Sequence, residues 1–134
     1  MNLTITQDLF QTRQWAASFA KTLRAPVCVA LHGDLGVGKS EIARTIIQTL
    51  RAPNTIVPSP TFTIVQNYDG ISHFDLYRVT DPSELVEIGL KHAIENDITL
   101  IEWPDVAGDM LPENTIHVFI DIHENGRRIR VGHE

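Results

Sequence analysis

Apolar residues recur at helical spacing in two stretches of the N-terminal half of the chain. This pattern predicts one helix from Thr6 to Leu23, capped by Thr6 and ended by Pro26, and another from Ser40 to Leu50. Between them, Val27 to Leu31 is a continuous apolar run, which is typical of a strand buried on both faces of a sheet. The predicted order is therefore helix, strand, glycine-rich segment and helix.

The C-terminal half reads mainly as short strands. The predicted strands are Thr61–Tyr68, Ile71–Tyr77, Ile98–Trp103, Thr115–Ile122 and Arg127–Val131. Asp69-Gly70 and Asn125-Gly126 are two-residue hairpin signals between neighbouring strands. Asp81-Pro82-Ser83-Glu84 predicts a helix start, with Asp81 as the cap and Pro82 at the first helical position. This mixture predicts an α/β fold: a single P-loop NTPase-like domain over residues 1–134, with a mixed, mostly parallel sheet flanked by helices and carrying β-hairpins.

The glycine-rich segment meets the full spacing of a P-loop, G-x-x-x-x-G-K-S. Its residues are Gly33, Asp34, Leu35, Gly36, Val37, Gly38, Lys39 and Ser40. Such a loop turns backbone N–H groups toward phosphate oxygens at the N-terminus of a helix. Lys39 would reach the β- and γ-phosphates, and the Ser40 hydroxyl would ligate Mg²⁺. The plain alternative is a glycine-rich turn with a chance lysine, and the strand before and helix after the loop argue against it.

Two carboxylates at strand ends are candidates for the rest of the site. Glu102 ends an apolar strand and fits a metal-proximal acid best, whereas Asp75 lies late on a hairpin strand. Each could instead be a solvated strand-end carboxylate. Thr61, in a proline-rich loop after the second helix, is placed where a γ-phosphate switch would lie, and a plain turn is its alternative.

Three further side chains have structural alternatives that are at least as common. His73 could be a ligand or base, although a partly buried, hydrogen-bonded histidine is more usual. Trp103 could stack on an adenine or simply pack in the core. Arg78 could neutralise charge on a transferred phosphate or form a surface ion pair.

Composition narrows the classes of partner. The formal net charge of −6 argues against DNA binding or direct grip on RNA, since phosphate contacts need clustered Lys and Arg, and Arg127, Arg128 and Arg130 form the one small basic cluster. Cys28 is the single cysteine and reads as a buried, inert thiol. No signal peptide or membrane-spanning run is visible, so we expect a cytoplasmic protein. The Asn/Thr-Lys-x-Asp element that reads guanine is also missing, which favours ATP.

Four motifs in one order carry a resemblance to a known family. They are the P-loop, then Ser59-Pro60-Thr61-Phe62-Thr63, then His73-Phe74-Asp75-Leu76-Tyr77-Arg78, then Glu102-Trp103. From about Thr6 to Val131 the chain resembles the TsaE (YjeE) family, which are small bacterial ATPases of tRNA threonylcarbamoyladenosine biosynthesis. The resemblance implies weak ATPase activity with ATP and Mg²⁺. It also implies work with TsaB and TsaD, which with TsaC place threonylcarbamoyl on adenosine 37 of tRNAs that read ANN codons.

The resemblance also implies roles for individual residues. Lys39 and Ser40 match the nucleotide and Mg²⁺ residues, Thr61 the switch-like threonine, Asp75 the acid of the H-x-D-x-Y-R motif, and Glu102 the Mg²⁺-proximal glutamate. Trp103 matches the tryptophan that follows this glutamate. Arg127 and Thr12 match positions that approach the nucleotide in some members. Where many members have Lys-Thr-Thr, this chain has Lys39-Ser40-Glu41, which places a carboxylate near the α-phosphate.

The leading hypothesis is therefore an ATPase that supports TsaB- and TsaD-like proteins and meets tRNA only through them. Asp75 or Glu102 could orient the attacking water. A small-molecule kinase is the alternative, and it would need an acceptor pocket and usually a lid with arginines. A nucleotide-sensing module without turnover is the third possibility.

Overall fold

The computed structural model describes residues 2–58 and 64–133. In chain order its elements are β1 (Asn2–Thr6), α1 (Leu9–Ala20), β2 (Val27–His32), α2 (Lys39–Leu50), β3 (Val65–Asn67), β4 (Ile71–Asp75), α3 (Ser83–Glu87), α4 (Leu90–Asn96), β5 (Ile98–Glu102), the 3₁₀ helix η1 (Pro104–Met110), β6 (Ile116–His123) and β7 (Gly126–Gly132). All strands join one sheet in the order β1-β7-β6-β2-β5-β4-β3.

The sheet is parallel at its centre and antiparallel at both edges. Within the described residues, β6, β2, β5 and β4 pair in parallel, whereas β1–β7, β6–β7 and β3–β4 pair antiparallel. The predicted α/β class and mixed sheet with hairpins are confirmed, with the parallel pairing confined to the four central strands. Parallel central strands bring their carboxyl ends to one edge of the sheet, where ligands of such folds usually bind.

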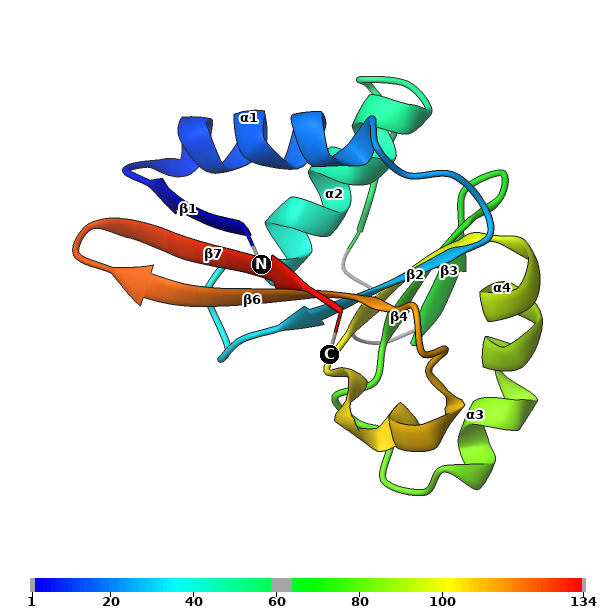
Figure 1. The fold of residues 1–134 in the computed structure, drawn as a ribbon. Helices are drawn as coiled ribbons and strands as arrows, with labels where there is room; N and C mark the ends of the chain where they lie inside the picture. The colour runs from blue at the N-terminus through cyan, green and yellow to red at the C-terminus, as the bar shows by residue number, and fades with distance from the viewer. Residues whose placement is uncertain (1, 59–63, 134) are drawn as a thin grey trace.

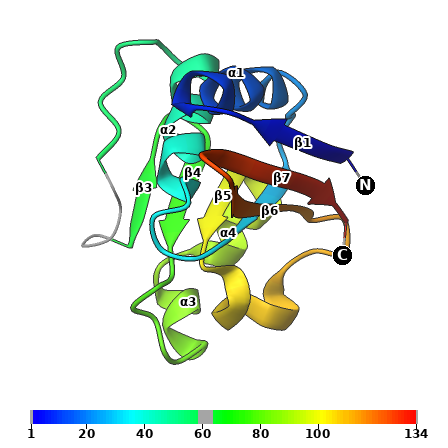
Figure 2. The ribbon, with the colours of Figure 1, turned by 90° about the vertical axis from the view of Figure 1, so that its left-hand side faces the viewer.

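Helices cover both faces of the sheet (Figure 1). On one face α1 and α2 pack against the sheet over a core that includes Ile42, Ile46 and Leu100. On the other face α3, α4 and η1 enclose a second core around Phe74 and Ile101. The turned view in Figure 2 shows α1 and α2 above the sheet and α3 below it. β4 and β5 are buried along their whole length and β2 over its four middle residues, which explains the largely apolar sequences of β2 and β5.

The first predicted helix begins later than its sequence pattern indicated. Thr6 ends strand β1, and Asp8 caps α1 by accepting a hydrogen bond from the backbone N–H of Gln11. Strand β1 was not predicted, and its exposed Leu3 and Ile5 alternate with residues on the other face of the sheet. Within residues 2–58 and 64–133, β1 pairs only with β7, at the far end of the chain, so no local pattern marks its partner.

Both predicted hairpins form, and glycine has a different role in each. At the β3–β4 turn, Asp69 and Gly70 both adopt positive φ, as the two-residue turn requires. At the β6–β7 turn the two loop residues are Glu124 and Asn125, one position earlier than predicted. Gly126 is instead the first residue of β7, where a Cβ would lie 1.8 Å from the carbonyl oxygen of Thr6.

Smaller differences occur elsewhere in the chain. The strand predicted over 61–68 is described only as β3, because residues 59–63, including Thr61, lie outside the described residues. Helix α3 begins at Ser83, one residue later than predicted, with Pro82 rather than Asp81 at the cap position. The carboxylate of Asp81 still accepts a hydrogen bond from the backbone N–H of Ser83. No helix among the described residues is long and apolar enough to cross a membrane.

Candidate functional site

The site lies where β2, β4 and β5 end at the same edge of the sheet. β2 leads directly into the glycine loop, which ends at the start of α2. The parallel register places Asp75 of β4 and Leu31 of β2 on either side of Glu102 at the end of β5. The prediction that the strand of Glu102 is central is confirmed, and β4 lies one strand in from the edge.

The glycine loop has the backbone conformation that its sequence predicts. Gly33, Gly36 and Gly38 all have positive φ, and Gly38 immediately precedes α2. At Gly33 a Cβ would lie 2.6 Å from Cγ2 of Val37 and 2.7 Å from the carbonyl oxygen of Ile120, so a larger residue would not fit. The first turn of α2, whose backbone N–H groups are free of helical partners, faces the same pocket.

Lys39 is folded back over the loop. Its ammonium group donates hydrogen bonds to the carbonyl oxygens of Gly33 and Asp34, and it lies 3.7 Å from the centre of the Trp103 ring. The side chain is 5% exposed. Burial lowers the pKa of Lys39 below its ordinary value, and the nearby carboxylates of Glu102, Asp75 and Asp34 oppose this shift. The ammonium group of Lys39 is thus held beside the space where a phosphate would bind.

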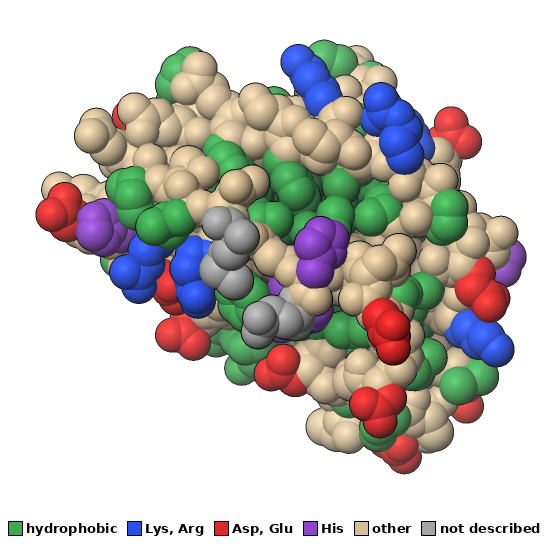
Figure 3. All heavy atoms as spheres, viewed as in Figure 1, with side chains coloured by type: hydrophobic (Ala, Val, Ile, Leu, Met, Phe, Trp, Pro, Cys, Tyr) green, Lys and Arg blue, Asp and Glu red, His purple; other side chains and the backbone are tan. Residues whose placement is uncertain are grey.

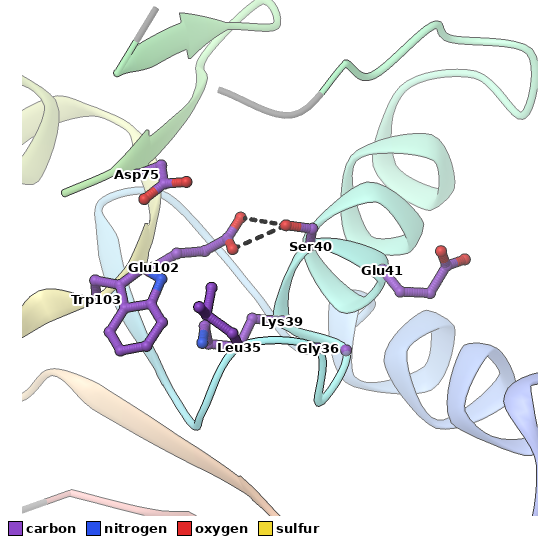
Figure 4. A pocket seen from close by; sticks show the side chains of 9 residues that line it. Leu35, Gly36, Lys39, Ser40, Glu41, Asp75, Glu102 and Trp103 are labelled. Atoms are coloured by element: carbon purple, nitrogen blue, oxygen red, sulfur yellow. Dashed lines mark hydrogen bonds between the residues drawn. The ribbon is translucent and has the colours of Figure 1, made fainter. Parts of the chain in front are cut away.

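The Ser40 hydroxyl and the Glu102 carboxylate meet directly. The Ser40 Oγ lies 2.9 Å from Oε1 and 3.2 Å from Oε2 of Glu102 (Figure 4). The other contact of this carboxylate is with His73, whose Nε2 lies 2.7 Å from Oε2. Glu102 is 3% exposed and His73 is 1% exposed. A buried carboxylate beside a hydroxyl at a helix N-terminus is the donor set expected for a P-loop Mg²⁺ site.

A pocket of about 250 Å³ joins these groups. Its lining residues are Leu35, Gly36, Gly38, Lys39, Ser40, Glu41, Asp75, Glu102 and Trp103. Asp75 is buried and accepts a hydrogen bond from the backbone N–H of Tyr77. The ring of Tyr77 lies 4.9 Å from that of Trp103, which lines the pocket. Figure 4 shows Asp75 and Glu102 on the strand side and Ser40 on the helix side of this pocket.

A second pocket of about 130 Å³ adjoins the first and shares Gly38 and Glu41 with it. Thr12 and Arg127, both implied by the family resemblance, line this second pocket. Arg127 donates from Nε to the carbonyl oxygen of Val37 at 2.7 Å, which ties β7 to the glycine loop. The Thr12 hydroxyl lies 2.7 Å from that of Thr6.

Glu41 turns away from Ser40 and toward α1. Arg13 of α1 and Arg44 of α2 each contact one of its carboxylate oxygens at 2.7 Å. Figure 4 shows the Glu41 side chain directed away from Glu102. The two arginines therefore neutralise the Glu41 carboxylate, which the sequence predicted to lie near the α-phosphate. Nothing in the sequence marked Arg13 for this contact, since it lies on a different helix.

Other candidates have simpler places in the fold. Arg78 is exposed. Cys28 is buried, and burial raises its thiol pKa to about 11, as suits an inert thiol. Thr61 lies outside the described residues, so its place relative to the pocket is not described.

The groups present fit a nucleoside triphosphate with Mg²⁺. Open space above Gly36 and Gly38 leaves the loop backbone accessible to phosphate oxygens. The described residues contain no cluster of three or more His, Cys, Asp or Glu that could cage a metal. A hydroxyl with one carboxylate instead suits Mg²⁺, which is usually bound by few protein ligands together with phosphates and water.

Comparison with known proteins decides the family. The family model described as "Threonylcarbamoyl adenosine biosynthesis protein TsaE" matches residues 6–129 of the chain. The chain belongs to the TsaE family. It is 38% identical over 130 residues to the tRNA threonylcarbamoyladenosine biosynthesis protein TsaE of Rickettsia bellii, covering 94% of this chain and 90% of that protein. It is 37% identical over 134 residues to the TsaE protein of Haemophilus influenzae, covering 92% and 84% respectively.

A solved structure supports the fold of this TsaE-family chain. The crystal structure of Bacillus subtilis YdiB matches with a TM-score of 0.78, covering 99% of this chain and 86% of that one. Its sequence identity is 22%, so this likeness concerns the fold alone. The family expected from the four sequence motifs is confirmed by the family model and the relatives.

Proposed function

We propose that this TsaE-family chain hydrolyses ATP with Mg²⁺ in support of TsaB- and TsaD-like proteins that form N6-threonylcarbamoyladenosine at position 37 of tRNA. The observation that carries the proposal is the contact between the Ser40 hydroxyl and the Glu102 carboxylate at the start of α2. The names of the relatives, which concern this tRNA modification, supply the biological setting.

Each group in the first pocket has a distinct part in the proposed reaction. The loop backbone and Lys39 bind the phosphates, and Lys39 exchanges its carbonyl contacts for phosphate oxygens. Ser40 and Glu102 hold Mg²⁺, which when bound supplies positive charge against the developing charge of the phosphates. Asp75 lines the pocket beside Glu102 and orients the attacking water, since Glu102 is already committed to Ser40.

The second pocket extends the site beyond the phosphates. Thr12 and Arg127 line it, and it shares Gly38 and Glu41 with the first pocket. We assign it to the nucleoside part of ATP. Trp103 lines the first pocket, and its ring contacts the ammonium group of Lys39. We therefore assign Trp103 to holding Lys39 rather than to stacking on the base.

The decisive experiment is phosphate release from ATP, with the chain alone and with TsaB- and TsaD-like proteins. Slow release that rises when both partners are added supports the proposal. Glu102→Gln should lose most Mg²⁺-dependent turnover while it retains nucleotide binding. An equal rate with and without partners would contradict the partner-dependent ATPase. A phosphorylated small molecule without free phosphate would point instead to a kinase.

A further inference from the structure

His73 is a buried polar side chain that does not line the nucleotide pocket. It lies on β4 with 1% of its surface exposed, and it is not among the residues that form the pocket of Lys39, Ser40 and Glu102. Its contact within the site is with Glu102, at 2.7 Å between Nε2 and Oε2. His73 therefore contacts the carboxylate of Glu102 without lining the ligand space itself.

The chemistry of this contact fixes the position of the imidazole proton. A carboxylate only accepts hydrogen bonds, so Nε2 of His73 must carry the hydrogen. The other ring nitrogen, Nδ1, is buried and has no hydrogen-bond partner within the described part of the chain. A buried polar atom without a partner costs free energy, so an apolar side chain would suit simple packing better at this position.

The contact with His73 differs from the other contact of Glu102. The Ser40 hydroxyl faces the pocket and, in the proposed function, also meets Mg²⁺. The bond from His73 involves no group of the pocket other than Glu102 itself, so His73 does not have to exchange this bond for a contact with the ligand. Groups that hydrogen-bond a metal ligand from behind commonly fix its orientation and strengthen metal binding.

We propose that His73 is a positioning residue that donates its Nε2 hydrogen to Glu102 and so holds the carboxylate toward Ser40 for Mg²⁺. This inference rests on the proposed function. It assigns a task to a residue of the H-x-D-x-Y-R motif other than its acid, and it explains why a polar ring with an unpartnered nitrogen is buried beside Leu100 in the sheet.

Substitutions at position 73 distinguish the effect of the Nε2 hydrogen-bond donor from the effect of the volume of the ring. In His73→Gln the amide nitrogen can replace Nε2, whereas in His73→Asn the shorter amide falls near Nδ1 and cannot reach Glu102. His73→Leu keeps an apolar side chain without a donor. Ser72→Ala is the matched control, because Ser72 is also buried on β4 but bonds to Asp97 rather than to Glu102.

The first measurement is the Mg²⁺ concentration for half-maximal stabilisation of the ATP complex against heat, together with ATP affinity in EDTA. The Mg²⁺ requirement should rise about tenfold or more in His73→Leu and His73→Asn, as for other groups that support metal ligands. It should stay near the wild-type value in His73→Gln and in Ser72→Ala. ATP affinity without Mg²⁺ should be unchanged in all four variants. If His73→Leu does not fold, the contrast between the Gln and Asn variants decides.

The second measurement is imidazole nitrogen NMR of the nucleotide-free protein, which reports the tautomer of His73. Hydrogen on Nε2 supports the proposal, and hydrogen on Nδ1 alone overturns it. An equal Mg²⁺ requirement in the wild type and the Leu and Asn variants also overturns it. A wild-type protein that binds no ATP would instead remove the proposed function, a failure that the wild-type control reveals directly.

Discussion

The ammonium group of Lys39 is held by the same loop that would bind phosphate. It donates to the carbonyl oxygens of Gly33 and Asp34 and lies over the ring of Trp103, and it is almost fully buried. Burial lowers its pKa, so the folded protein tolerates this charge less well than water does. A phosphate would replace two neutral carbonyls with a full negative charge, which is a much stronger partner for the cation.

Replacing Lys39 by Met should separate nucleotide binding from folding. Met keeps the apolar stem and removes the buried charge, so the melting temperature should equal or exceed that of the wild type. ATP affinity should fall roughly 10- to 100-fold, the range for losing a charge-assisted hydrogen bond. Calorimetric titration and thermal unfolding measure the two effects. Exposed Lys21 gives the control, since Lys21→Met should change neither. A Lys39→Met protein that binds ATP normally would remove Lys39 from the site.

His32, which immediately precedes the glycine loop, also has a pKa that the fold shifts. Its Nε2 lies 2.8 Å from Nδ1 of His117, and its ring stacks on Phe119. Burial lowers its pKa below the ordinary 6.5, with His117 lowering it further, Asp105 raising it and Lys39 lowering it. The unfolded chain therefore binds a proton at a higher pH than the folded protein does. The stability from neutral His32 is present above about pH 6.5 and is lost as the pH falls through the lower folded pKa.

The expected result is a urea midpoint that falls between about pH 7 and about pH 5, and falls less in His32→Gln than in the wild type. His133→Gln, at an exposed position, should follow the wild type. An equal fall in His32→Gln and wild type would mean that other groups, such as carboxylates, account for the loss.

At the scale of the elements, strands β1 and β7 pair closely where Gly126 packs against the backbone of Thr6. A Cβ on Gly126 would lie 1.8 Å from the carbonyl oxygen and 2.7 Å from the carbonyl carbon of Thr6, both backbone atoms. Neither can move without disturbing the β1–β7 pairing, which begins with Thr6 opposite Arg127. Arg127 in turn contacts Val37, so the glycine loop is joined to this strand pair.

Gly126→Ala should therefore lower the free energy of unfolding by about 3 kcal/mol, the upper range for forcing extra volume into packed structure. Gly89→Ala is the comparison, because Gly89 has φ of +79° but open space around its missing side chain. That substitution should cost about 1–2 kcal/mol through left-handed backbone alone. Chemical denaturation measures both values. If Gly126→Ala lowers the free energy of unfolding no more than Gly89→Ala does, β1 can move away from the new side chain at little cost.

Elements with a local sequence signal were predicted well. The glycine loop, the amphipathic α2 and the apolar β2 and β5 each follow from a few adjacent residues, and each forms as expected. β1 was missed because its pairing with β7 joins residues more than 120 positions apart, and Thr6 was mistaken for a helix cap when Asp8 has that role. Capping residues of similar chemistry two positions apart cannot be separated without knowing where the strand ends.

In the candidate site, too, residues with a local sequence signal could be predicted and contacts between distant elements could not. Glu102 and Asp75 could be proposed together from the sequence because parallel strands bring such strand-end residues to one edge, and the structure places them side by side. The contacts that refine their roles cross between elements: His73 to Glu102, Lys39 to Trp103, and Arg13 to Glu41. For His73 a signal existed, because residues two apart on a strand share a face and Asp75 lies two positions on. Arg13 carried no comparable signal.

At the scale of the whole molecule, basic residues are outnumbered by acidic ones, with 11 Lys and Arg against 17 Asp and Glu. On the face in Figure 3, basic side chains lie in small separate groups, and no continuous basic patch covers the face. The arginines close in sequence near the C-terminus have separate contacts: Arg127 with Val37, Arg128 with Asp121, and Arg130 over the ring of Phe119. With a formal net charge of −6, the protein offers few of the phosphate contacts that hold RNA.

This distribution predicts that the isolated chain does not bind tRNA at physiological salt. Electrostatic binding requires several phosphates to be neutralised at once, and non-specific affinities even of basic proteins are commonly 10⁻⁴–10⁻⁶ M by order of magnitude. In a fluorescence titration, labelled tRNA should show no saturable change up to roughly 10 µM of this chain, within that range. Anisotropy should rise when TsaB- and TsaD-like proteins are added, because they would carry the RNA contact. Saturable binding by the chain alone, abolished in an Arg128→Ala, Arg130→Ala double variant, would show instead that its sheet meets tRNA directly.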